Sequence, residues 1–158
     1  MRALSQLRSL SLDCDRFDAD HSMTDEDAAW VCVQSLCLPA SVKSVWLHRI
    51  ALETVAPLPA GLDSLGMLTV RYDADEMGEA LRAATGLRAL GIENSPLPSC
   101  VPRGLTSLAC SAAPEDASDE TYEAFLRNLP RGLRDLSVRG ADDRLAPALA
   151  PVRELREL

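Results

Sequence analysis

Histidine, cysteine and acidic side chains are the groups in this chain that could do chemistry, and their spacing argues against catalysis. The chain has two histidines, His21 and His48, and neither lies in an H-E-x-x-H zinc-binding sequence. There is no G-x-S-x-G sequence for a serine nucleophile and no phosphate-binding loop. Cys14 and His48 could form a nucleophile and base only if folding brought them together. We therefore expect no enzyme activity and no cofactor, with the Cys14–His48 pair as the alternative.

The acidic residues Asp13, Asp15, Asp18 and Asp20 invite comparison with a calcium-binding loop. Such a loop needs glycine at its sixth position and glutamate at its twelfth. Here those positions hold Asp18 and Thr24. We therefore expect no metal, and interpret the segment as a solvated acidic loop that leads into a helix.

Charge and cysteine content narrow the classes of partner and compartment. The net charge is −8 and Lys43 is the only lysine, so no basic stripe is present to bind nucleic acid. No apolar run is long enough to cross a membrane. The five cysteines are odd in number and none forms a C-x-x-C sequence, which favours a reducing compartment. We expect a cytoplasmic protein, or one in a host cytosol if it is a secreted effector.

A short sequence motif recurs along the whole chain. Six segments follow the pattern L-x-x-L-x-L, with valine, isoleucine, methionine or cysteine allowed at the apolar places: 7–12, 42–47, 62–67, 87–92, 105–110 and 133–138. A seventh unit begins near 152 and is broken. The phrase L-P-x-[GS]-[LV] precedes three of the segments, at 38–42, 58–62 and 129–133. Because proline cannot extend a helix and glycine or serine eases a bend, the phrase predicts a tight turn into each of six strands.

On these motifs the chain resembles the leucine-rich-repeat family, in particular the repeats of bacterial effectors and of amoebal and viral proteins. The resemblance implies an α/β fold: a right-handed solenoid with a parallel inner β-sheet, an outer layer of helices and short turns, and a concave face that binds proteins. We expect one such domain over 1–158. The family places asparagine or cysteine at the ninth position of each repeat, where this chain departs from the pattern, so the backbone there needs other partners. The residues at that position are Asp15, Ile50, Val70, Ser95, Ala113 and Ala141.

Three segments between the expected strands have helical signals. Segment 22–36 has Thr24 as a cap and acidic residues in its first turn, and segments 75–84 and 118–129 share this design. We expect all three to form outer helices.

Outward-facing strand positions supply the candidate site. Nearly all are small, and Trp46 stands out between Ser11 and Gly66. The alternative is that its ring folds over Gly66 and only packs. The partner-binding residues that we predict are Trp46, His48, Arg49, Asp13, Glu93, Asn94 and Arg139.

The function that we expect is recognition of a partner protein by the concave face. One alternative is a substrate-recognition part of a ubiquitin-ligase component or secreted effector, and another is a structural remnant without a dedicated ligand. Because the first and last repeats lack polar caps, self-association through the ends of the domain is a further expectation.

Overall fold

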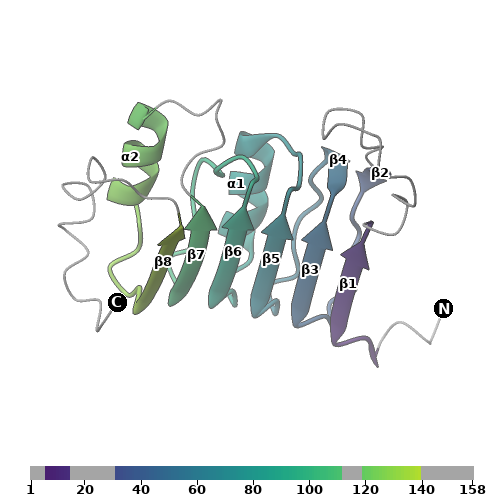
Figure 1. Cartoon of the computed structure of the whole chain (residues 1–158). Helices are drawn as coiled ribbons and strands as arrows, with labels where there is room; N and C mark the ends of the chain where they lie inside the picture. The colour runs from purple at the N-terminus through teal and green to yellow at the C-terminus, as the bar shows by residue number, and fades with distance from the viewer. Residues whose placement is uncertain (1–5, 15–30, 112–118, 140–158) are drawn as a thin grey trace, which may run out of the picture.

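The computed structural model describes residues 6–14, 31–111 and 119–139, and these residues form eight strands and two helices (Figure 1). The elements are β1 (Ser9–Asp13), β2 (Val31–Ser35), β3 (Ser44–His48), β4 (Ile50–Thr54), β5 (Ser64–Leu68), α1 (Ala74–Ala83), β6 (Ala89–Glu93), β7 (Ser107–Ser111), α2 (Asp119–Arg127) and β8 (Asp135–Arg139).

Six of the strands form one parallel sheet in the order β1-β3-β5-β6-β7-β8. Each strand comes from one of the six repeated segments, so the strand predictions are confirmed. The register is the same at every pair, which places Ser44 beside Ser64 and Ser64 beside Ala89. Equivalent positions of the repeat therefore form rows that run across the sheet.

A repeated turn produces this register. The N–H of Leu62 donates to the carbonyl of Pro59 over 2.9 Å, and Val42 bonds in the same way to Pro39 over 3.0 Å. One carbonyl then accepts the first two N–H groups of the following strand segment: Lys43 accepts from Asp63 and Ser64 over 2.8 and 3.0 Å. The predicted tight turn is confirmed, and it sets where each strand begins.

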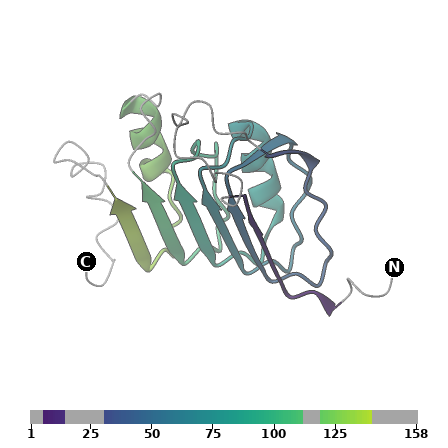
Figure 2. The same cartoon turned by 45° about the vertical axis from the view of Figure 1, so that its right-hand side comes forward.

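The core lies on one side of this sheet. The second and fourth residues of each strand point to that side, which we call the inward face, and in β3, β5, β6 and β7 they are buried. Both helices lie against this side (Figure 2). An apolar pocket lined by Leu47, Leu52, Leu65 and Met77, among others, shows that β3, β4, β5 and α1 meet there.

The predicted fold class is wrong. A leucine-rich-repeat solenoid needs a regular outer layer of helices and short turns, whereas the described residues hold a second, two-stranded parallel sheet of β2 and β4 and only two helices. Part of the predicted helix 22–36 is strand β2, and 22–30 lie outside the described residues. Val31 and Val33 explain the difference, because β-branched residues favour a strand when an edge is available for pairing. That edge is β4, with Val31 beside Ile50.

The other two predicted helices are present as α1 and α2. The Asp73 carboxylate caps α1 by accepting the N–H groups of Asp75 and Glu76 over 3.0 and 2.9 Å. The connection from β6 to β7 contains Pro96, Pro98 and Pro102 and has no helix. The broken seventh repeat near 152 lies outside the described residues.

Candidate functional site

The candidate site lies on the side of the six-stranded sheet that faces away from the core, which we call the outward face. It is formed by the first, third and fifth residues of each strand. Most of these residues are serine, glycine or alanine, and the Ser64 hydroxyl donates to Ser44 over 2.9 Å. The large side chains on this face are therefore few.

Trp46 in β3 is the largest of them, and the residue is 41% exposed. Its neighbours in the register are Ser11 on β1 and Gly66 on β5. The ring lies over Gly66, because a Cβ atom at that position would overlap the Cε3 and Cζ3 atoms of Trp46. The indole is thus fixed by packing and still presents a large apolar surface to solvent, so the packing interpretation holds for one side of the ring only.

Asp13 and His48 form a pair at the carboxyl ends of β1 and β3. They are direct neighbours in the register, and Nδ1 of His48 lies 3.2 Å from Oδ1 of Asp13. The His48 side chain is 13% exposed and that of Asp13 is 56% exposed. The pair orients the imidazole beside Trp46, which lies two residues earlier on the same face.

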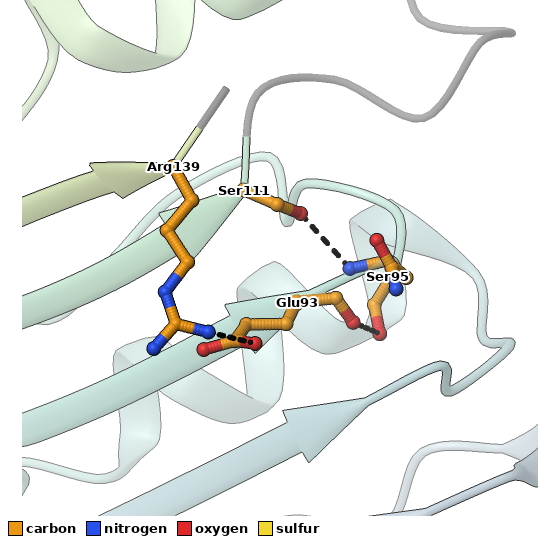
Figure 3. Close-up of polar contacts among 5 residues, drawn as sticks. Glu93, Ser95, Ser111 and Arg139 are labelled. Carbon is orange, nitrogen blue, oxygen red and sulfur yellow. Dashed lines mark hydrogen bonds and ion pairs between the residues drawn. The ribbon is translucent and has the colours of Figure 1, made fainter. Parts of the chain in front are cut away.

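Glu93 and Arg139 form a second pair further along the same edge (Figure 3). Nη1 of Arg139 donates to Oε2 of Glu93 over 3.0 Å, although their strands, β6 and β8, are not neighbours. Arg139 sits beside Ser111 of β7, and its side chain crosses that strand. Because Ser111 is small, the long arginine side chain can lie over it.

Left-handed backbone follows three of the strands at this edge. Arg49, Thr69 and Asn94 have φ angles of 53°, 53° and 47°. The N–H of Arg49 donates to Leu68 over 3.1 Å, and that of Asn94 donates to the Ser111 hydroxyl over 2.9 Å. At each of these residues the chain turns away from the six-stranded sheet, and after Arg49 it continues directly into β4.

Ser95 occupies the ninth position of its repeat, where the family has asparagine or cysteine, and it supplies part of the backbone hydrogen bonding that those residues would supply. Its buried hydroxyl accepts the N–H of Val70 over 2.9 Å. The same hydroxyl donates to the carbonyl of Glu93 over 2.9 Å (Figure 3). At Ile50 the backbone is satisfied differently, because its carbonyl accepts the N–H of Arg71. Three other ninth positions, Asp15, Ala113 and Ala141, lie outside the described residues.

The predicted site residues thus form two groups and not one. Asp13, His48 and Trp46 lie together with Arg49, while Glu93, Asn94 and Arg139 lie further along the edge. Leu68 separates the two groups, with His48 on one side and Glu93 on the other. Leu68 and Ser111 lie in the same row as His48, Glu93 and Arg139. Because equivalent positions of the repeat form rows, the sequence could have identified both as members of this edge.

The Cys14–His48 pair considered for catalysis is not formed. Cys14 packs against the core, whereas His48 is on the outward face. Cys110 is buried and shares a hydrogen bond with the Tyr122 hydroxyl over 3.4 Å. Burial raises the pKa of the Cys110 thiol, which keeps it protonated and unreactive.

The described residues hold neither a metal-binding cluster nor a membrane-spanning helix. In the described ranges, no group of three or more histidine, cysteine or acidic side chains is arranged to hold a metal ion. Of the acidic loop, Asp15, Asp18 and Asp20 lie outside those ranges. Neither described helix is long and apolar enough to span a membrane.

Comparisons with known proteins supply no family for this chain. No family model matches it. Searches among curated proteins and among solved structures also find no match.

Proposed function

We propose that this protein binds a partner protein through the outward face of its six-stranded sheet, with Trp46 at the centre of the contact. The observation that carries the proposal is the exposure of a large aromatic ring on a face of small side chains. Burying such a ring costs little conformational entropy, and tryptophan is enriched among residues that dominate binding energy.

Small side chains beside Trp46 suit a polypeptide partner. Gly66, Gly91 and Ala109 follow Trp46 in the same row of the sheet. Another main chain can approach the sheet closely over these residues, and an apolar side chain of the partner can pack against the exposed edge of the indole. The partner that we propose is therefore a protein segment with an apolar residue that contacts Trp46.

The two polar pairs favour a partner with charges of its own. Asp13 with His48 lies next to Trp46, and Glu93 with Arg139 lies beyond Leu68. Each pair combines an acidic side chain with a nitrogen-bearing one, so the edge offers both hydrogen-bond donors and acceptors at the rim of the apolar centre. Polar rims of this kind give orientation and specificity more than affinity.

The cytoplasm is the compartment that we propose. All five cysteines lie in the described residues as free thiols, and Cys32 and Cys37 are exposed. Exposed thiols suit a reducing compartment.

Affinity capture from native cells, with the amount of each captured protein measured, tests the proposal. We expect Trp46→Ala to reduce recovery of the specific partner at least about tenfold, because a residue at the centre of an interface is worth about 2 kcal/mol or more. Val31→Ala is a matched control, since Val31 is 37% exposed and lies on β2, away from the outward face. We expect it to leave recovery unchanged.

A photo-crosslinking residue locates the partner directly. Placed at Ala109 on the outward face, it should crosslink the protein whose recovery depends on Trp46. Placed at Glu79, which is exposed on α1, it should not. Equal crosslinking from both positions, or a partner that binds Trp46→Ala as well as wild type, would overturn the proposal.

A further inference from the structure

The outer edge of β1 carries backbone groups that face away from the sheet. In the part of the chain that the structure describes, β1 pairs only with β3. The Arg8 carbonyl accepts from the N–H groups of Lys43 and Ser44, so Arg8 faces β3. Because alternate residues of a strand direct their N–H and C=O groups to opposite sides, Leu10 also faces β3. The backbone groups of Ser9 and Ser11 therefore point outward from the edge.

Apolar side chains at this edge are less covered than their neighbours in the middle of the sheet. Leu10 and Leu12 are only partly buried, whereas Val45 and Leu47, which lie beside them in the register, are 2% and 1% exposed. The inward face thus loses its cover at β1. A strand that paired with this edge would satisfy the backbone groups and bury these leucines in one step.

We propose that β1 pairs in an antiparallel manner with β1 of a second copy of this chain, with Ser11 of one copy opposite Ser11 of the other. This register is self-complementary. It makes Ser11 a hydrogen-bonded pair with itself and sets Leu10 opposite Leu12 of the second copy on the inward side. It also sets the Ser9 hydroxyl opposite the Asp13 carboxylate of the second copy. No like charges face each other, and the twofold symmetry closes the assembly at a dimer.

Pairing of β1 with β8 of another copy is the competing arrangement. It would continue the sheet in parallel, with Ser11 opposite Ser137, and would form open chains because each copy keeps a free edge. β8 is a poorer edge for pairing, because Asp135 and Arg139 are both exposed on it and charged side chains protect an edge. Arg139 is also held by Glu93.

Analytical ultracentrifugation of the full chain tests the proposal. We expect wild type to show a concentration-dependent equilibrium between monomer and dimer. Ser11→Lys should weaken the dimer at least about tenfold, because two like charges would lie directly opposite each other. Ser11→Ala is the control and should leave the dimer intact. Circular dichroism should show the same fold in all three proteins, since Ser11 is exposed on the outward face.

Mixing variants decides between the two arrangements. An equimolar mixture of Ser11→Lys and Ser11→Glu should form a heterodimer, because only the twofold register places the two new charges opposite each other. In the β1–β8 arrangement each would face Ser137, and mixing would restore nothing. Ser9→Glu, which would face Asp13 of the second copy, should weaken the dimer independently. A wild type that stays monomeric at all concentrations, assembly unaffected by Ser11→Lys, or a mixture that fails to associate would overturn the proposal.

Discussion

The inward and outward faces of the same six strands obey different rules. Along the inward face the register stacks aliphatic residues on aliphatic residues, as in the row of Val45, Leu65, Leu90 and Leu108. All four are buried. The outward face has no such uniformity, since small residues surround a few large ones. Packing of the core explains why the inward row is aliphatic. Most of the large outward side chains add little to that core, so we expect them to serve binding and not stability.

The largest expected effect lies in the inward row. Leu90→Ala should lower the free energy of unfolding by about 2–5 kcal/mol, because it removes a side chain that is 2% exposed and leaves a cavity between β5 and β7. Ser107→Ala on the outward face should change it by less than about 0.5 kcal/mol. Urea unfolding followed by circular dichroism measures both. Similar losses from the two variants would break the comparison.

A polar residue of the interior comes next. Ser95→Ala should cost about 1–3 kcal/mol, because the Val70 N–H would lose its partner in a buried place. The Glu93 carbonyl would keep the N–H of Thr69, which donates to it over 2.8 Å. Ser64→Ala removes an outward hydroxyl bond to Ser44 and leaves groups that water can reach, so its cost should be smaller. Hydrogen exchange of the Val70 amide should speed up in Ser95→Ala alone. If Ser64→Ala lowers the free energy of unfolding as much as Ser95→Ala does, then solvent exposure does not explain the difference between the two faces.

The sequence predicted the six strands of the main sheet but not every contact between them. The recurrence of leucine at fixed places located all six strands, and the proline turn explained where each begins. The sequence did not predict β2, since the segment around Val31 carries helical signals that local reasoning favours, and only its pairing with β4 overrides them. The bond between Glu93 and Arg139 was also out of reach, because it skips a strand.

Buried hydroxyl and thiol groups should make the inward face sensitive to alkali. Burial raises the pKa values of Tyr72, Cys110 and Tyr122, so each holds its proton more tightly in the folded state than in the unfolded chain. As pH rises past their ordinary values of 9.0 and 10.0, the unfolded chain loses protons first and stability falls.

Tyr122→Phe isolates one of these groups. It should cost about 0.5–1.5 kcal/mol near neutral pH, through loss of the hydrogen bond to Cys110, and it should reduce the decline in stability above pH 10. Thermal unfolding between pH 7 and 11 measures both effects. A variant that loses stability with pH as steeply as wild type would show that Tyr122 does not contribute.

The smallest expected effect belongs to the ion pair of the outward face. Glu93 and Arg139 are 25% and 72% exposed, so solvent screens their attraction and their coupling should amount to about 0.2–1 kcal/mol. A double-mutant cycle with Glu93→Gln and Arg139→Gln measures it, and raising the salt concentration should reduce it further. Glu93→Gln leaves the backbone bond from Ser95 to the Glu93 carbonyl in place, which separates the side-chain pair from the buried network beneath it. A coupling well above 1 kcal/mol that resists salt would mean that this pair stabilises the fold, and the contrast between the two faces would then hold only for the half of the sheet that carries Trp46.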